Sequence, residues 1–485
     1  MNLKGLPGGQ YKPLSDRGIA TIHDTALMIL EEVGFTYESG LDQVLALLES
    51  AGAKVDAGTA RVTFPRTFIE EHIRSAPESV ILYSRDGEND LDLGEDRVHL
   101  GTGGAAVRIV DMETGLYRST TLKDLYLLGR LVHKLENIHF FLRPCIPRDI
   151  PETAYDVNVF YTCFRATTKH VMAGVNDIEG FRKVLELATM VAGGEKVLAQ
   201  KPFISIITSF AISPLKLCTQ STTIMREAVL NKIPVALSCA PMAGSTSPVT
   251  MAATLAQVHA EQLAGIALCQ IINPGAPVIY GGIPGTANMR NMAYQGGAVE
   301  CGMMNAAIHQ MARHIKVPNY NSSGLTDSKV PDGQAAWEKA ITTLLAAMGG
   351  SNYVHHAAGM LDSMAGLAYE QFVIDDEIIG MSCKVLKGID VDPEHLALEV
   401  IKDVGPGGNF MIHPHTLKHM RSEYFPGNGV TDRDGLSRWE QQGRMDARER
   451  ARMIVGKILD APEEPCLPAD VDLAIREKFS EIKTI

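Results

Sequence analysis

Long hydrophobic runs are missing from this sequence, which has no uninterrupted apolar stretch of the roughly 20 residues that a membrane-spanning helix needs. Its first residues, MNLKGLPGGQYKPLSDRG, have no apolar core and no cleavage-site pattern, so no signal peptide is predicted. Basic residues are in the minority, with 45 Lys and Arg against 57 Asp and Glu and a formal net charge of -12. Since a nucleic-acid-binding surface needs an excess of positive charge, that class of protein is disfavoured.

Paired cysteines are missing as well. The eight cysteines are scattered along the chain without any C-x-x-C pair, which predicts reduced thiols. Cys239, in LSCAP, has no identifiable base, and we interpret it as a buried thiol. Together these absences predict a cytoplasmic protein that binds neither membrane nor nucleic acid.

The residues that are present have the composition of an ordinary globular protein, 45% hydrophobic and 21% charged. Residues 1–135 mix helical and strand patterns, and we interpret them as an extension packed on the rest of the chain. The predicted helices are IATIHDTALMILEEVGF, LDQVLALLESAGAKVD, PRTFIEEHIRSAP and TTLKDLYLLGRLVHKLENI, the last capped by Thr121. The predicted strands are SVILYSRD and RVHLGTGGAAVRIVDMETG.

A regular alternation begins near residue 136. Short apolar runs are each followed by a small or polar loop and a helical pattern, and their starts are roughly 30 to 43 residues apart, the size of a βα unit. The seven runs are HFFLRP, KHVMAG, FISIITS, PVALSC, PVIYGG, VPNYNSSG and NYVHHAAG. They predict an α/β fold in which residues 136–485 form a (β/α)8 TIM-type barrel with C-terminal helices, although no eighth strand is identified. An open doubly wound sheet is the alternative, but its G-x-G-x-x-G turn is missing from the first units.

In such a barrel the chemistry takes place at the carboxyl ends of the strands. The segments expected there are RPCIPRD, SFAISP, SCAPMAGSTSP, GGIPGTANMR, NSSGLTDSK and HHAAGML. They are rich in Gly, Ala, Ser and Pro and contain almost no material for a catalytic triad or a pair of carboxylates. The segment NSSGLTDSKVPDGQAAWE is unusual because a plain connection between a strand and a helix is much shorter.

Histidines suggest a different function. His355 and His356 end a predicted strand, and NFMIHPHTLKHM carries His413, His415 and His419. Neighbouring imidazoles suit zinc, which would make the chain a barrel metallohydrolase. However, HTLKHM has a helical pattern, and such an enzyme would also need an Asp at a late strand end, so we expect no metal.

Several stretches together resemble the trimethylamine methyltransferase family, the corrinoid-dependent methylamine methyltransferases. They are HLGTGGAAVRIVDMETG, TTLKDL, KHVMAGV, PVALSCAPMAGSTSPVTMAATLAQVHAE, TDSKVPDGQAAWE and LAYEQFVIDDEIIGM. The resemblance implies a (β/α)8 barrel that passes a methyl group from an amine to the cobalt of a separate corrinoid protein. Cobalamin is then carried by that partner. This chain lacks the D-x-H-x-x-G signature of corrinoid binding, so no tightly bound cofactor is expected.

The archetype of the family uses an in-frame pyrrolysine to act on trimethylamine, whereas this sequence has only the twenty standard residues. Members without pyrrolysine that it resembles act on quaternary amines, so glycine betaine is the leading expectation. Proline betaine, carnitine and γ-butyrobetaine are the alternatives. A quaternary nitrogen leaves as a neutral tertiary amine without proton transfer, which fits strand ends without a triad. A non-catalytic betaine-binding protein would have the same loops.

Candidate site residues follow from this reading. Aromatic faces for the ammonium are Phe210, Tyr280, Tyr320 and Tyr353. Polar groups for a carboxylate are His356, Arg313, Asp327, Ser328 and Lys329, with Arg313 alternatively a helix-end charge at the opposite end of the barrel. Small residues that would face the corrin are Gly103, Gly104, Gly244, Ser245, Gly282 and Gly324. The sequence leaves open whether the chain forms a homo-oligomer.

Overall fold

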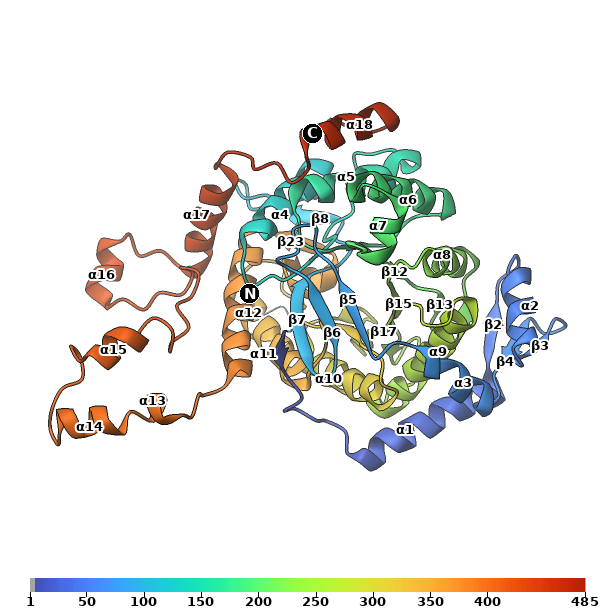
Figure 1. Ribbon diagram of the computed structural model, residues 1–485, viewed down its shortest axis with the longest axis horizontal. Helices are drawn as coiled ribbons and strands as arrows, with labels where there is room; N and C mark the ends of the chain where they lie inside the picture. The colour runs from blue at the N-terminus through green and yellow to red at the C-terminus, as the bar shows by residue number, and fades with distance from the viewer. Residues whose placement is uncertain (1–4, 485) are drawn as a thin grey trace.

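Parallel strands occupy the centre of the molecule and helices surround them, as Figure 1 shows for the computed structural model, which describes residues 5–484. The parallel strands are β7 (Arg97–Thr102), β10 (Phe141–Leu142), β11 (Val171–Ala173), β12 (Ile204–Thr208), β15 (Val235–Cys239), β17 (Val278–Gly282), β20 (Tyr320–Ser322) and β21 (Tyr353–Ala358). Each is followed along the chain by a helix: α4 (Leu122–Lys134), α5 (Tyr155–Ala166), α6 (Ile178–Ala192), α8 (Thr219–Leu230), α9 (Met251–Ile272), α10 (Val299–His314), α11 (Gly333–Gly349) and α12 (Tyr369–Lys387). The fold is therefore mixed α/β.

The parallel strands form two sheets that contact each other at both edges. One sheet has the order β10-β11-β12-β15-β17, and the other contains β7, β21 and β20 together with the short antiparallel β1 (Leu6–Pro7). At one junction a parallel bridge joins Tyr280 to Asn319. At the other, the His139 N–H donates to the Leu100 carbonyl at 2.9 Å.

Seven of these strands lie within the seven apolar runs of the sequence, and β7 is the one that the pattern does not identify. It lies within residues 1–135, so the predicted extension contributes both β7 and α4 to the central unit. Gly101 on β7 faces Phe140, and a Cβ atom at this position would lie 2.5 Å from the phenyl ring. Close packing of β7 against β10 therefore requires a residue without a side chain, which weakens the strand pattern in the sequence.

A hairpin formed by β5 (Ser79–Leu82) and β6 (Leu91–Gly94) covers one end of the parallel strands. Its buried side chains alternate with exposed ones, as expected for a hairpin with one apolar face. They form one hydrophobic cluster with inward-facing residues of the parallel strands: Val80, Leu82, Leu91 and Leu93 contact the group Phe140, Leu142, Met172, Ala236, Ile279, Tyr320 and Tyr353. The interior is thus closed at this end.

The other N-terminal elements pack on the outside of the helices. They comprise α1 (Asp16–Met28), β2 (Phe35–Tyr37), α2 (Asp42–Ser50), β3 (Lys54–Asp56), β4 (Arg61–Thr63) and α3 (Arg66–His72). Helices α1 and α3 cover α9. This cover explains why every residue of α9 from Thr254 to Gln270 is buried, as expected for a helix without a polar solvent-facing side.

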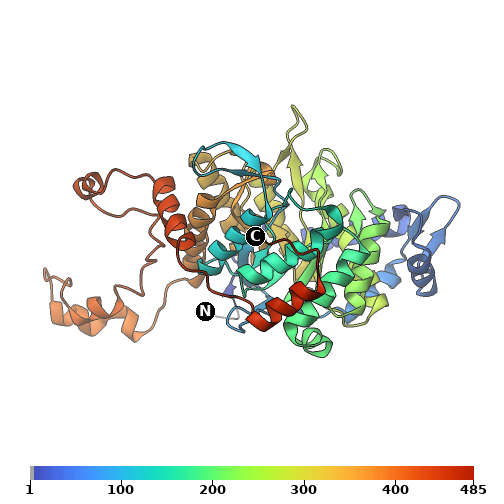
Figure 2. The ribbon, with the colours of Figure 1, turned by 90° about the horizontal axis from the view of Figure 1, so that it is seen from above.

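The C-terminal residues extend away from the body and then return to it, as Figures 1 and 2 show. We refer to residues 387–429 as the arm; it contains α13 (Pro393–Leu396), α14 (Leu398–Val404) and α15 (Pro414–His419). After α16 (Leu436–Gln441), α17 (Ala447–Leu459) packs on α12 and α4, and α18 (Ala469–Lys478) packs on α6. Within residues 5–484, no helix combines the length and the hydropathy that a membrane span requires.

Candidate functional site

Buried polar side chains lie in the interior along β20 and β21, beginning with the first residue of each strand. Tyr320 and Tyr353 belong to the interior cluster, and His355, two residues after Tyr353, points to the same side of its strand. The ring centroids of Tyr320 and His355 are 4.8 Å apart, and Tyr353 stacks on Phe140 at 3.6 Å. Neither tyrosine hydroxyl and neither His355 ring nitrogen has a hydrogen-bond partner among residues 5–484. Because unpaired buried polar groups are costly, this group needs a ligand or water.

The neighbouring His356 is held by the strand beside it. Its backbone has a φ of 68°, and its Nδ1 lies 2.7 Å from Ser322 Oγ. Burial lowers the pKa of His356 to about 3, with the Lys339 charge acting in the same direction. Burial also lowers the pKa of His355 well below its usual range, and His356 adds to the effect. Both imidazoles are therefore neutral near pH 7 and act as hydrogen-bonding groups rather than as charges.

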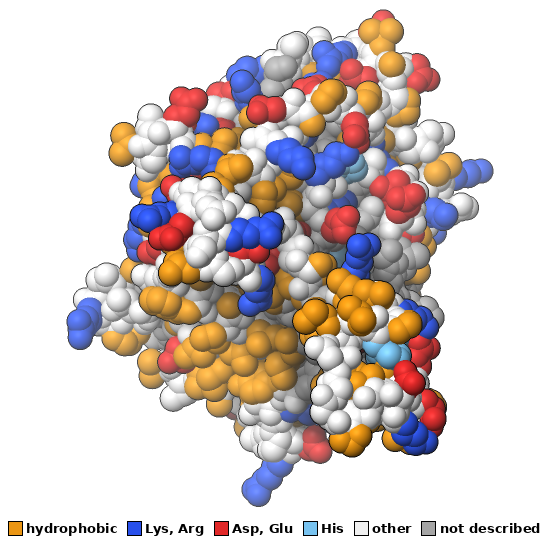
Figure 3. Space-filling model, turned by 90° about the vertical axis from the view of Figure 1, so that its left-hand side faces the viewer, with side chains coloured by type: hydrophobic (Ala, Val, Ile, Leu, Met, Phe, Trp, Pro, Cys, Tyr) orange, Lys and Arg blue, Asp and Glu red, His pale blue; other side chains and the backbone are white. Residues whose placement is uncertain are grey.

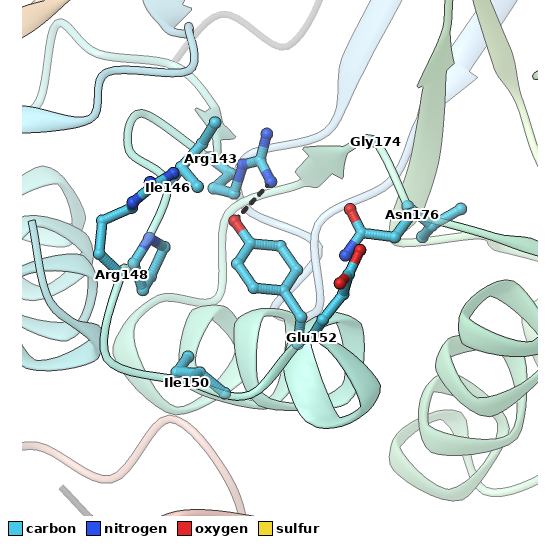
Figure 4. Close-up of a pocket in the computed structure, with 10 residues that line it drawn as sticks. Arg143, Ile146, Arg148, Ile150, Glu152, Gly174 and Asn176 are labelled. Atoms are coloured by element: carbon cyan, nitrogen blue, oxygen red, sulfur yellow. Dashed lines mark hydrogen bonds between the residues drawn. The ribbon is translucent and has the colours of Figure 1, made fainter.

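A pocket of about 440 Å³ opens between the carboxyl ends of β10 and β11 and the start of α5 (Figure 4). Arg143, the residue after β10, donates a hydrogen bond to the Tyr155 hydroxyl at 3.0 Å, and its guanidinium lies 6.0 Å from the Tyr155 ring centre. Arg148 and Ile146 line one side of the pocket, and Glu152 and Asn176 line the other. We call this the Arg143 pocket.

The four aromatic candidates do not lie together. Tyr320 and Tyr353 face the interior, whereas Phe210 and Tyr280 belong to the cluster between the strands and the helices. The Phe210 ring packs against Gly265 of α9, and the Tyr280 hydroxyl lies 2.9 Å from His259 Nδ1 on the same helix. Strand alternation turns these two rings outward, so we do not include them in the candidate site.

The polar loop after β20 is mostly buried and hydrogen-bonded within the chain. Thr326 Oγ1 and the Asp327 N–H both donate to Glu338 of α11, at 2.6 and 2.8 Å. The Asp327 carboxylate accepts from Ser363, Ser328 is buried, and Asp332 caps α11. These contacts explain the polarity of the loop, because they join it to α11 and to the segment after β21.

The two long cations proposed for a substrate carboxylate are both paired with carboxylates of the chain. Lys329 is exposed and lies 3.6 Å from Asp362. Arg313 is in the last turn of α10, and its Nε lies 3.4 Å from Asp96. Because Asp96 precedes β7, Arg313 is at the amino-terminal end of the parallel strands. Arg313 thus occupies the alternative position, as a helix-end charge away from the carboxyl ends of the strands, and we do not include it in the candidate site.

The small residues proposed to face a corrin divide by exposure. Gly103, Gly282 and Gly324 are buried, while Gly104 and Gly244 are half-buried and Ser245 is exposed. A Cβ at Gly104 would lie 2.6 Å from Met360, and one at Gly244 would lie 2.5 Å from Met289. Packing against the chain's own side chains thus explains the glycines, and Gly104, Gly244 and Ser245 are the ones that a docked partner can reach.

His413, His415 and His419 lie in the arm, far along the chain from His355 and His356 and outside the central strands (Figure 1). Across residues 5–484, no group of three or more His, Cys, Asp or Glu side chains has the arrangement of a metal site. The histidines that suggested a metallohydrolase are therefore not gathered around one centre.

The Arg143 pocket is the part of the site that the sequence pattern missed. Arg143 is in RPCIPRD, which was placed at a strand end, but nothing in the segment distinguishes a binding arginine from a surface one. An indication was available in the spacing, since Arg143 directly follows the apolar run and therefore lies at the carboxyl end of its strand.

Comparison with known proteins gives a consistent result across the chain. The family model described as trimethylamine methyltransferase (MTTB) matches residues 5–483. A trimethylamine methyltransferase MttB of Desulfitobacterium hafniense is 35% identical over 467 residues, covering 96% of this chain and 93% of the relative. A glycine betaine methyltransferase of the same species is 32% identical over 469 residues, covering 96% of each.

Among solved structures, the monomethylamine methyltransferase (MtmB) of Methanosarcina barkeri is similar in fold. Its TM-score is 0.50 at 10% sequence identity, and the match covers 100% of this chain and 96% of that chain. At this identity the similarity concerns the fold alone.

Proposed function

The chain belongs to the trimethylamine methyltransferase family, and from this premise we propose that it transfers a methyl group from a quaternary amine to the Co(I) of a separate corrinoid protein. Glycine betaine is the leading substrate, because one relative that matches along nearly the full length is named a glycine betaine methyltransferase. The remaining tertiary amine would then be dimethylglycine. Other betaines are the alternative.

The observation that carries this proposal is the buried, neutral and incompletely hydrogen-bonded group formed by Tyr320, Tyr353 and His355. Aromatic rings and neutral polar atoms suit a quaternary ammonium, which is attracted to electron-rich surfaces and has no N–H to donate. A water-poor surrounding also strengthens the electrostatic contacts that orient the cation.

The proposed methyl transfer needs no acid or base from these residues. The N–CH3 bond breaks, its electron pair stays on nitrogen, and the methyl group leaves as the equivalent of a methyl cation. No proton moves, so neutral His355 and His356 are suitable neighbours and no general acid is needed. The work of the side chains is to orient the substrate and exclude water.

A corrin carried by the partner protein would supply Co(I), the nucleophile that takes the methyl group. Gly104 and Gly244 are half-buried and Ser245 is exposed, and small side chains at these positions would let a planar macrocycle approach. In this proposal the chain itself holds no corrinoid tightly.

We further propose that the eight parallel strands form a closed (β/α)8 barrel. Support comes from the two junctions between the sheets, the bridge from Tyr280 to Asn319 and the hydrogen bond from His139 to Leu100. A cytoplasmic location is proposed with it, because the eight cysteines are all free and Co(I) needs reducing conditions.

The test is anaerobic incubation of the purified protein with cob(I)alamin and a panel of amines, following methylcobalamin by its absorbance. The panel contains glycine betaine, carnitine, γ-butyrobetaine, choline and trimethylamine. We expect turnover with at least one quaternary amine and none with trimethylamine. Saturable betaine binding without any methyl transfer would instead identify a binding protein.

A further inference from the structure

We propose that the Arg143 pocket is an anion subsite that binds the carboxylate of the quaternary amine substrate. The identity of the anion rests on the proposed function, since that function supplies a substrate with a carboxylate. The existence of an anion subsite rests on the contacts of Arg143 itself.

The guanidinium of Arg143 is incompletely paired within residues 5–484. It donates one hydrogen bond, to the neutral Tyr155 hydroxyl, and its buried Nε has no partner. No carboxylate of the described chain lies within 4 Å of it. A guanidinium has five N–H donors in a rigid fork, so most of its capacity is free for a ligand.

Arg85 shows how this chain satisfies an arginine that has only a structural role. Its Nε is also without a partner among residues 5–484, but its two terminal nitrogens donate to the carbonyls of Phe164, Thr167 and Cys466 at 2.5 to 2.7 Å. No comparable set of carbonyls surrounds Arg143. The difference indicates that Arg143 is placed for a group that the folded chain does not supply.

The groups around Arg143 favour an anion with some apolar surface. Arg148 adds a second positive charge at the edge of the pocket, Asn176 lines the opposite side, and Ile146 and Ile150 provide apolar walls. Glu152 also lines the pocket, on the same side as Asn176, and it is exposed to solvent. A carboxylate can therefore form the paired, charge-assisted hydrogen bonds that arginine makes best.

A second acid, Asp156, lies behind the pocket and accepts a hydrogen bond from the Asn176 N–H at 2.9 Å. Burial raises the pKa of Asp156 to about 6, while the hydrogen bond from Asn176 and the charge of Arg143 act to lower it, so Asp156 is mostly ionised near neutral pH. Asp156 therefore offsets part of the positive charge of Arg143 from a distance, but it makes no ion pair with the guanidinium within 4 Å, and Arg148 adds positive charge at the pocket edge.

The pocket also has a suitable size and position. About 440 Å³ is at the lower end of the range for small-molecule sites. Arg143 directly follows β10, so the pocket lies at the carboxyl end of that strand, and its hydrogen bond to Tyr155 places the guanidinium on the α5 side. The pocket is thus at the same end of the parallel strands as Gly104 and Gly244, which follow β7 and β15 and where a corrin is proposed to approach.

The first test compares Arg143→Gln and Arg143→Lys with the wild type in methyl transfer from betaines and from choline, which has no carboxylate. We expect Arg143→Gln to lower kcat/KM for betaines by about 10- to 100-fold, mainly through KM, and to leave choline within about twofold. Arg143→Lys should recover part of the loss. The matched control is Arg182→Gln, which removes an exposed arginine of α6 outside the pocket.

Two results would overturn the subsite: an equal loss on betaines and choline, which indicates a structural role, and no loss on either. The second test does not depend on turnover. Phenylglyoxal labelling of the wild type, mapped by mass spectrometry, should be slower at Arg143 with glycine betaine than with choline. Protection without any methyl transfer would support the subsite and contradict the proposed function, whereas turnover without protection would contradict the subsite alone.

Discussion

At the scale of single residues, the two histidines at the end of β21 determine how the reaction should respond to pH. Burial lowers the pKa of His356 to about 3. Burial also lowers the pKa of His355 well below that of an exposed imidazole. A lowered folded-state pKa means that each ring stays neutral above that value, although it would take up a proton near 6.5 when unfolded.

We therefore predict that kcat/KM for methyl transfer is flat between pH 6 and 8 with respect to these two side chains. The measurement is a pH series under anaerobic conditions for the wild type and for His356→Gln. An inflection near pH 6.5 that is present in the wild type and lost in the variant would show that His356 titrates in the working range, against this account.

Arg313 gives a prediction of the opposite kind, in which little should change. Its pairing with Asp96 is half-exposed on both sides, and such surface pairs contribute roughly 0–1 kcal/mol to the free energy of unfolding. Arg313→Ala should thus leave the KM for glycine betaine unchanged and lower the unfolding free energy only slightly. A rise in KM for betaine but not for choline would return Arg313 to the substrate site.

At the scale of elements, the regular alternation predicts seven of the central strands, whereas β7 is predicted as a strand of the extension and not as a member of the central sheet. Its membership of the parallel sheet depends on pairing with β21, more than 250 positions away in the chain, and on the glycine at position 101. Local patterns do not contain that information. For the same reason, the polar loop after β20 was interpreted as a substrate loop, although Thr326 and Asp327 bind Glu338 instead.

The closeness of β7 and β10 can be tested through Gly101. A Cβ there would lie 2.5 Å from the Phe140 ring, which itself stacks on Tyr353, so Gly101→Ala should destabilise the protein by about 1–3 kcal/mol. The measurement is the change in unfolding free energy in urea. Gly435→Ala is the matched control, because a Cβ at that position meets nothing within 4 Å. Equal stability of the two variants would contradict the packing of β7 on β10.

The candidate site shows the same limit of sequence reasoning. The strands could be placed from the alternation of strands and helices, and with them Tyr320, Tyr353 and His356. The direction of each side chain could not, since Phe210 and Tyr280 differ from Tyr320 only in the face of the strand that they occupy. Arg143 could not be singled out because its importance comes from the partners that it lacks.

At the scale of the whole molecule, the arm differs from the rest of the chain. None of residues 387–429 is buried, and large hydrophobic side chains such as Ile389, Met411 and Ile412 are more than 70% exposed. Figure 3 views the side from which the arm projects and shows hydrophobic side chains at that surface. Its helices have four to seven residues, too few to be stable alone.

We predict that limited proteolysis of the purified protein cuts first within the arm. The two fragments should stay associated, because α17 returns to pack on α12 and α4. Mass spectrometry of the early fragments and size-exclusion chromatography of the nicked protein provide the measurement. First cuts within the central strands or helices, at a rate equal to that in the arm, would contradict this description.

The central claim is that the chain removes a methyl group from a quaternary nitrogen without proton transfer and passes it to Co(I). The most direct measurement uses glycine betaine labelled with ¹³C in its methyl groups, incubated anaerobically with the protein and stoichiometric cob(I)alamin, and followed by NMR. The account predicts one labelled methylcobalamin for each dimethylglycine formed. The dimethylglycine keeps its two labelled methyl groups, and no third product carries label. Dimethylglycine without labelled methylcobalamin, or no consumption of any quaternary amine by a folded protein, would contradict it.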